Sequence, residues 1–136
     1  MKQLEFSHPF SETKIEERLL KEYVEHDGRL VIGVDFDNTI FDTHAIGGDF
    51  SCVIEVVREC ILRGMVMCLY TSSEEPEDID RKVSIFTEMF GVKPDYVNYS
   101  PLSPKASKPF FNILLDDRAG LEESWRVLYH VLEKTS

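Results

Sequence analysis

The stretch LVIGVDFDNTI, residues 30–40, decides the fold of this chain. Its first part is almost continuously apolar and rich in β-branched residues, which is typical of a strand buried within a parallel sheet. The apolar part ends in Asp35 and Asp37, two carboxylates separated by a single residue. The stretch therefore predicts a central strand with acidic side chains at its carboxyl end.

Apolar residues recur at helical or strand spacing on both sides of this stretch. The pattern predicts helices over 11–26, 52–63, 77–90 and 120–133, and further strands over 65–70, 95–98 and 110–115. Because helices and strands alternate through short connections, we expect an α/β fold with a doubly wound parallel sheet and right-handed crossovers. We expect one domain over residues 1–136, with a helical extension at 1–28 and the core at 30–133.

The chain of 136 residues carries 25 acidic and 15 basic side chains, and its formal net charge is −10. This charge argues against broad binding of nucleic acid, which needs a basic surface. No apolar run approaches the ~20 residues of a membrane-spanning helix, and residues 1–14 lack the apolar core of a signal peptide. The three cysteines form no paired motif and are expected to be reduced and buried. We therefore expect a cytoplasmic protein with no membrane partner.

Chemically capable side chains follow three of the predicted strands. They are Asp35 and Asp37 after the first strand, Thr71 and Ser72 after the second, and Asp116 and Asp117 after the last. Ligands bind at the carboxyl ends of the strands in such sheets, so we expect these side chains to share one site. Lys105 and Lys108 approach the same edge from the loop before the last strand.

The four carboxylates of this set need a counter-charge, because close carboxylates repel one another in a partly dry site. A divalent cation supplies that charge, and ligation by oxygen alone favours Mg²⁺. The four histidines show no paired spacing of the kind that zinc sites use.

An Asp-x-Asp pair can also divide the labour of phosphoryl transfer. One carboxylate attacks the phosphoryl group and becomes an aspartyl-phosphate, while the other acts as general acid and base. A hydroxyl such as that of Thr71 and a lysine ammonium can hold the phosphoryl oxygens. The combination indicates hydrolysis of a phosphomonoester.

The sequence resembles the haloacid dehalogenase superfamily of phosphohydrolases over roughly residues 30–133. The resemblance is carried by residues 34–40, residues 69–72, Lys108 and residues 114–117, in the order of that family's four motifs. Asn38 stands where the family most often has glycine, a mild departure because asparagine tolerates a left-handed conformation. The resemblance implies a Rossmann-like sheet of order 4-1-2-3, Mg²⁺ as cofactor and activity as a phosphoric monoester hydrolase.

Residue by residue, the resemblance implies that Asp35 is the nucleophile, that Asp37 is the general acid and base, and that Lys108 steadies the nucleophile and the phosphate. It implies phosphate binding by Thr71, Ser72 and Lys105, and a metal site built from Asp35, Asp116, Asp117 and, through its backbone carbonyl, Asp37. Lys105 competes with Lys108 for the lysine role, and the position of Lys108 just outside the last strand favours Lys108.

The segments where that family inserts cap domains are short in this chain. Only about a dozen residues separate Thr39 from the helix at Cys52, too few for a folded cap. We therefore expect a small capless member with an open site, to which a second subunit of a homo-oligomer could lend a lid. The acidic surface favours a small phosphorylated substrate, such as a nucleotide or a sugar phosphate, over nucleic acid.

Two other folds with acidic pockets place their motifs in a different order. A response-regulator receiver has its acid pair first and its lysine last, and a topoisomerase-primase domain has a lone glutamate before its Asp-x-Asp. Three further alternatives stay open for this chain: a catalytically weak binding or regulatory protein of the same fold, and a phosphatase acting on polynucleotide ends or on phosphoproteins.

Overall fold

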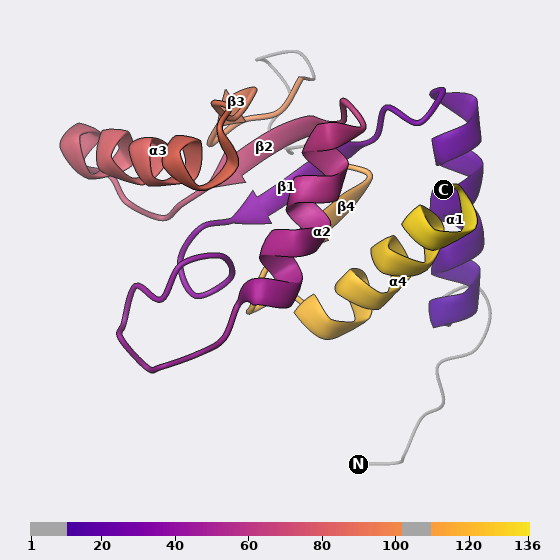
Figure 1. Ribbon diagram of the computed structural model, residues 1–136, viewed down its shortest axis with the longest axis horizontal. Helices are drawn as coiled ribbons and strands as arrows, with labels where there is room; N and C mark the ends of the chain where they lie inside the picture. Colours follow the sequence, from indigo (N-terminus) through magenta and orange to yellow (C-terminus); the bar gives the residue numbers. More distant parts are fainter. Residues whose placement is uncertain (1–10, 102–109) are drawn as a thin grey trace.

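The apolar stretch that opens the core forms strand β1, Val31–Asp35, whose middle residues are buried. The computed structural model describes residues 11–101 and 110–136 of the chain. In this part of the chain β1 shares one sheet with β2 (Val66–Tyr70), β3 (Tyr96–Val97) and β4 (Ile113–Leu115). All pairings are parallel and the order is β3-β2-β1-β4, as Figure 1 shows. The predicted strand order is therefore confirmed.

The register of the sheet brings the ends of three strands level with one another. Asp35 at the end of β1 is paired with Tyr70 at the end of β2. On the other side, Val34 is paired with Leu115, the last residue of β4. Whatever follows these strands therefore lies at a common edge of the sheet.

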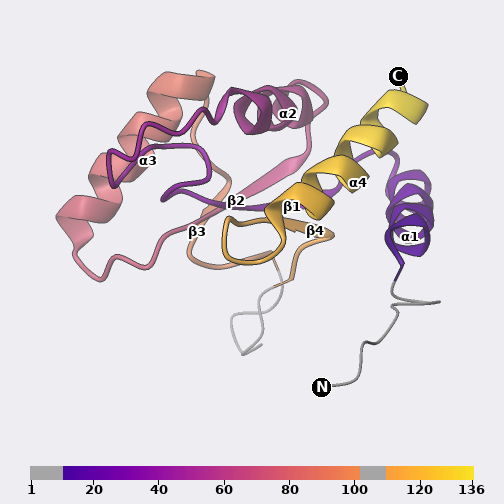
Figure 2. The same ribbon diagram turned by 90° about the horizontal axis from the view of Figure 1, so that it is seen from below.

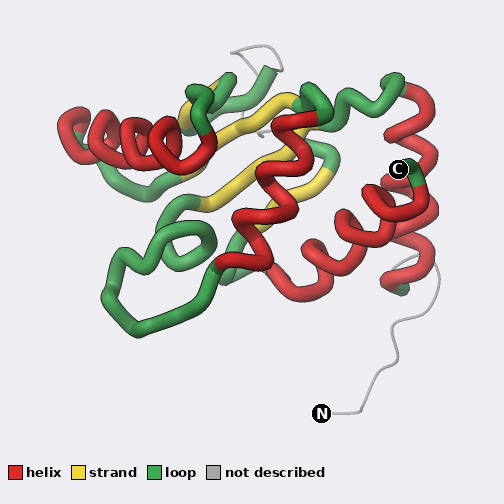
Figure 3. Tube along the Cα trace, in the orientation of Figure 1, coloured by secondary structure: helices red, strands yellow, loops and turns green. Residues whose placement is uncertain are grey.

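Four helices accompany the strands in the described part of the chain: α1 (Glu12–Glu25), α2 (Ser51–Leu62), α3 (Pro76–Phe90) and α4 (Leu121–Lys134). Their ends follow local chemistry. The hydroxyl of Ser11 accepts the Lys14 N–H at the start of α1, Pro76 occupies the first turn of α3, and Gly91 ends α3 with φ 75°. Each helix begins and ends within one or two residues of its predicted limits, and Figure 3 shows how helices and strands alternate.

The two views in Figures 1 and 2 place α2 and α4 side by side over one face of the sheet. There, Val34 of β1, Val57 of α2 and Leu128 of α4 are fully buried in one apolar core. The opposite face is approached by the segment that leads into β4. A Cβ added to Gly33 would lie 2.9 Å from the ring of Phe111, so glycine is required for this close approach.

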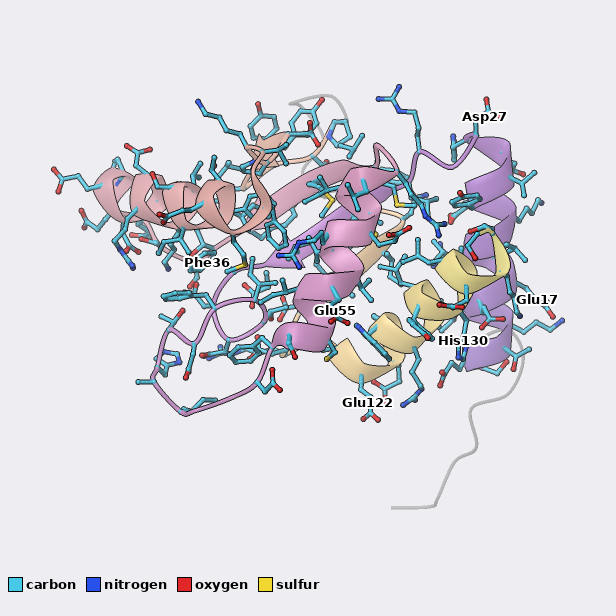
Figure 4. All side chains as sticks on the ribbon, in the orientation of Figure 1. Glu17, Asp27, Phe36, Glu55, Glu122 and His130 are labelled. Atoms are coloured by element: carbon cyan, nitrogen blue, oxygen red, sulfur yellow. The ribbon has the colours of Figure 1, made fainter. Side chains whose placement is uncertain are left out.

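Helix α1 packs beside α4 at the β4 end of the sheet and belongs to the same small domain (Figure 2). The guanidinium of Arg126 donates to both oxygens of Glu12 at 2.9 and 3.0 Å. His130, which Figure 4 shows on the side of α4 that faces α1, lies 2.8 Å from Glu16. Leu19 of α1 is fully buried in the core, so α1 is attached to the core by apolar packing as well as by these pairs.

Strands β3 and β4 are shorter than predicted, and Asn112 explains the difference at β4. The Asn112 side-chain oxygen accepts the Val31 N–H at 2.7 Å, and the Asn112 N–H donates to the Val31 carbonyl at 2.8 Å. A side chain thus takes one place in the hydrogen-bond ladder, and the regular strand begins only at Ile113.

The structure confirms an α/β fold with a parallel sheet in one small domain. All three cysteines are free, but Cys52 is exposed, so the prediction that all are buried is wrong for this residue because it faces outward at the start of α2. Among residues 11–101 and 110–136, no helix has the length and hydropathy needed to cross a membrane.

Candidate active site

Polar side chains from three strands meet at the common edge of the sheet. Asp35 ends β1, Thr71 directly follows β2, and Asp116 directly follows β4. They border or adjoin a cavity of about 470 Å³. Its lining comprises Asp35, Asp37, Asn38, Thr43, His44, Ser72, Ser73, Asp78, Lys82, Asp116, Asp117 and Arg118. The predicted convergence of the acidic residues is confirmed.

Three of the four predicted carboxylates form a tight cluster. One carboxylate oxygen from each of Asp35, Asp116 and Asp117 lies within 4.8 Å of the others. Burial raises the pKa of Asp35 to about 7, helped by its hydrogen-bonding neighbour Asp117 and by the charge of Asp116. Full ionisation of the cluster is therefore unfavourable when no cation is bound.

Thr39 contacts two of the three carboxylates of this cluster. Its side chain is fully buried, and its hydroxyl lies 3.2 Å from a carboxylate oxygen of Asp35 and 3.3 Å from one of Asp117. The same hydroxyl oxygen accepts the Asp117 N–H at 3.1 Å. A single hydroxyl thus connects the end of β1 to the loop after β4 and fixes the spacing of the acids.

The donor set of this cluster fits Mg²⁺. It consists of carboxylate oxygens, the ligand type that Mg²⁺ prefers, and the raised pKa of Asp35 reflects repulsion and desolvation that a bound cation would relieve. The side chain of Asp37 is hydrogen-bonded to other partners, which leaves its backbone carbonyl for the metal role that the resemblance implies.

Asp37 lies two residues beyond Asp35 but has a different environment. Its carboxylate accepts hydrogen bonds from the hydroxyls of Thr43 at 2.8 Å and Thr71 at 2.9 Å. It also accepts from the ammonium of Lys82, 2.9 Å from Oδ1 and 3.1 Å from Oδ2. Burial raises the pKa of Asp37, but these hydrogen bonds and the charge of Lys82 outweigh burial and leave the pKa below its ordinary value.

Lys82 of α3 lines the cavity and contacts Asp37, and sequence reasoning did not predict it. The residue is only 5% exposed, although lysine is rarely buried unless it is paired. Burial lowers its pKa, but Asp37 and Asp78 outweigh burial and leave the pKa above its ordinary value. The spacing in the sequence could have identified Lys82, because it shares a helix face with Ile79 and the buried Phe86. A lysine on an apolar face is expected to be buried and paired with an acidic group.

Of the residues predicted to bind phosphate or to assist the nucleophile, only Thr71 and Ser72 lie in the described part of the chain. Ser72 lines the cavity, whereas the hydroxyl of Thr71 is engaged with Asp37 and Lys82. Lys105 and Lys108 lie outside the described residues, so their predicted roles stay predictions.

Asn38 adopts the left-handed conformation that the sequence analysis considered acceptable for asparagine, with φ 56°. Its side-chain amide hydrogen-bonds the His44 ring, which places a histidine at the rim of the cavity. The Asn38 side-chain oxygen is buried and accepts no hydrogen bond from the residues that the structure describes. The turn after β1 thus forms part of the cavity wall.

Comparisons with models of protein families, with curated proteins and with solved structures find no match to this chain.

Proposed function

We propose that this chain is a Mg²⁺-dependent phosphatase of the haloacid dehalogenase type, which hydrolyses a phosphomonoester through an aspartyl-phosphate on Asp35. The observation that carries the proposal is the placement of two carboxylates after one strand: Asp35 lies in a cluster with Asp116 and Asp117, whereas Asp37 is hydrogen-bonded by Thr43, Thr71 and Lys82. Asp35 must be ionised to attack phosphorus, and a cation bound by the carboxylate cluster would lower the raised pKa of Asp35.

Asp35 is suited to be the nucleophile because its carboxylate borders the open cavity beside Asp116 and Asp117. In the first step an oxygen of Asp35 forms a bond to phosphorus while the ester P–O bond breaks. The departing oxygen takes a proton from the carboxyl group of Asp37, and the leaving group departs as the alcohol. The products of this step are the free alcohol and an acyl phosphate on Asp35.

Asp37 then reverses its role in the second step. Its carboxylate accepts a proton from a water molecule as the water oxygen bonds to phosphorus, and the bond between Asp35 and phosphorus breaks. Inorganic phosphate leaves, and both carboxyl groups return to their starting states. In the free site the low pKa of Asp37 supports the base role, and the acid role requires the negative charge of a bound phosphoester to raise that pKa.

The metal would be held by Asp35, Asp116 and Asp117, and when bound it supplies positive charge that screens the nucleophile from the phosphoryl oxygens. Thr39 contributes by holding two of these carboxylates at a fixed spacing. These carboxylates are therefore already in position before the substrate binds, and they need not rearrange during the reaction.

The form of the cavity supports a small phosphorylated substrate. Its volume of about 470 Å³ lies in the range typical of small-molecule sites, and the segments around it that the structure describes contain no inserted cap domain. Five of the residues that line the cavity are acidic and two, Lys82 and Arg118, are basic, and the chain has a net charge of −10, so a long polyanion would be repelled. A single phosphoryl group brought to the cluster with its metal avoids most of this repulsion.

The test is a panel of phosphorylated metabolites, nucleotides, phosphopeptides and oligonucleotide ends assayed for release of inorganic phosphate. We expect turnover of at least one small ester that requires Mg²⁺, is lost on adding EDTA and is abolished in the Asp35→Asn protein. Failure of every ester with the wild-type protein would contradict the proposal and favour a binding or regulatory protein. Preference for oligonucleotide ends or phosphopeptides would leave the chemistry intact and correct the substrate class.

A further inference from the structure

The ammonium group of Lys82 is saturated by acceptors of the protein itself. A lysine ammonium has three N–H donors. In this structure Nζ lies 2.9 Å from the nearer oxygen of Asp37, 2.9 Å from the hydroxyl oxygen of Thr71 and 3.3 Å from a carboxylate oxygen of Asp78. The three acceptor groups match the three donors, so none is left over for a phosphoryl oxygen.

We propose that Lys82 is a positioning residue that aims the carboxylate of Asp37 and does not bind the phosphoryl group of the substrate. This inference rests on the proposed function, because it assigns Lys82 a task within that reaction. It separates Lys82 from the lysine role that the sequence resemblance gives to Lys108, in which a lysine contacts nucleophile and phosphate.

The hydrogen bonds to Asp37 show how the orientation of its carboxylate is fixed. Thr43 lies in the loop after β1, Thr71 follows β2, and Lys82 comes from α3, so three separate segments donate to one carboxylate. Donors from three directions leave the Asp37 side chain one orientation in which all are satisfied. Lys82 also donates to Thr71, so the lysine orients the hydroxyl that in turn donates to Asp37.

Contacts with Asp78 and Phe36 restrict the position of the Lys82 ammonium. Asp78 accepts from its ammonium one helical turn away, and the ammonium lies 5.7 Å from the centre of the Phe36 ring. The side chain is 7% exposed, which removes most of the conformational freedom that a surface lysine would have. A flexible, solvated lysine could not fix a carboxylate, whereas this buried lysine can.

The expected consequence is a loss of rate without a matching loss of binding. In the Lys82→Met protein, the Asp37 carboxylate keeps its two hydroxyl donors, Thr43 and Thr71, but loses the ammonium donor of Lys82. A small misplacement of a catalytic group can lower the rate roughly a hundredfold. We expect kcat to fall roughly 30- to 100-fold, while KM and the inhibition constant of inorganic phosphate change by less than about threefold. Esters with poor leaving groups should lose more than activated aryl esters, because only they depend fully on the proton from Asp37.

The experiment compares Lys82→Met with Lys82→Arg and with Arg81→Met in the presence of Mg²⁺. Arg81 is the matched control because it precedes Lys82 on α3 and pairs with Asp78, yet it makes no hydrogen bond or ion pair with Asp37 among the described residues. We expect wild-type kinetics from Arg81→Met and partial recovery of kcat in Lys82→Arg. Each kcat is taken at the variant's own pH optimum and per folded molecule, with the melting temperature measured alongside. Lys82→Gln replaces the methionine variant if the latter does not fold.

Two kinetic results would overturn the inference. A rise of KM and of the phosphate inhibition constant with kcat near the wild-type value would make Lys82 a substrate ligand. A lowered melting temperature with unchanged kcat per folded molecule would make it purely structural. If the wild-type protein turns over no ester, the proposed function fails first. A crystal structure of Lys82→Met then decides the positioning claim separately, because an unmoved Asp37 carboxylate would refute it and a displaced one would support it.

Discussion

Replacing Asp35 by asparagine should stabilise the protein when no metal is present, even though the change removes the proposed nucleophile. Burial, with Asp117 and Asp116, raises the pKa of Asp35 from an ordinary value of 3.8 to about 7. A difference of this size corresponds to roughly 4 kcal/mol of unfavourable energy for the ionised form. Because Asp35 is only partly buried and faces an open cavity, solvent screening reduces the expected penalty to roughly 1–2 kcal/mol.

The penalty depends on pH in a direction that the pKa of Asp35 determines. Below about pH 4 the carboxyl is protonated in the folded and unfolded chains alike, so the penalty is absent. Between about pH 4 and pH 7 the folded protein keeps a proton that the unfolded chain has released, so this group's contribution to stability falls as pH rises. Above about pH 7 the full penalty is present. Asparagine carries no charge at any of these values and escapes it.

Urea unfolding in EDTA, followed by circular dichroism between pH 4.5 and 8, measures the effect. We expect Asp35→Asn to exceed wild type by roughly 1–2 kcal/mol at pH 8 and by progressively less towards acid. Asp80→Asn, which removes an exposed carboxylate of α3 outside the cluster, is the control and should show no such trend. With Mg²⁺ at a hundred times its Kd, wild type should gain roughly 2.7 kcal/mol and reverse the order. A variant that is less stable at pH 8 in EDTA, or a difference independent of pH, would refute the reasoning.

Four further predictions follow from the site, the sheet and the sequence resemblance. Millimolar Mg²⁺ should raise the wild-type Tm, and Asp116→Ala should erase most of that rise in a thermal melt, because one of the three clustered carboxylates is lost. Asp37→Asn should slow esters with poor leaving groups far more than aryl phosphates, and equal losses across a leaving-group series would contradict its acid role. In steady-state kinetics, Lys108→Ala should chiefly lower kcat and Lys105→Ala should chiefly raise KM, and the reverse would exchange the two lysines. Gly33→Ala should lower stability by roughly 1–3 kcal/mol in urea unfolding, because the added methyl meets a phenylalanine ring at 2.9 Å, and an unchanged midpoint would show that the ring yields freely.

The sheet and the acid cluster were predictable because both follow from periodicity along single segments. An apolar run that ends in acids identifies β1, and parallel pairing brings the ends of such runs together whatever their distance in sequence. Asp35, Asp116 and Asp117 converge for this reason alone. The elements that carry the chemistry are therefore visible before any contact between them is known.

The partners of Asp37 were not predictable in the same way. Lys82 lies 45 residues from Asp37 in sequence, and its contact depends on how α3 is rotated about its own axis. The helical pattern shows that Lys82 is on a buried face but does not show which group it meets there. Asn112 is a similar case, since no local rule predicts that a side chain will take a backbone place beside Val31.

The late position of β4 in the chain has a consequence for the order in which the protein folds. β1 and β2 meet after a local crossover, but β4 must return past both to pair with β1, and the Thr39 hydroxyl reaches Asp117 across 78 residues. Closing so long a loop is entropically slow, and the last pairing brings negative charge against negative charge. If the cluster binds the proposed Mg²⁺, we expect docking of β4 to be the step that the cation accelerates most, and release of β4 to be the first opening that a chelator promotes. Amide hydrogen exchange in β4 should become faster than in β2 when Mg²⁺ is withdrawn, as expected if the ion of the proposed site also holds the final strand in place.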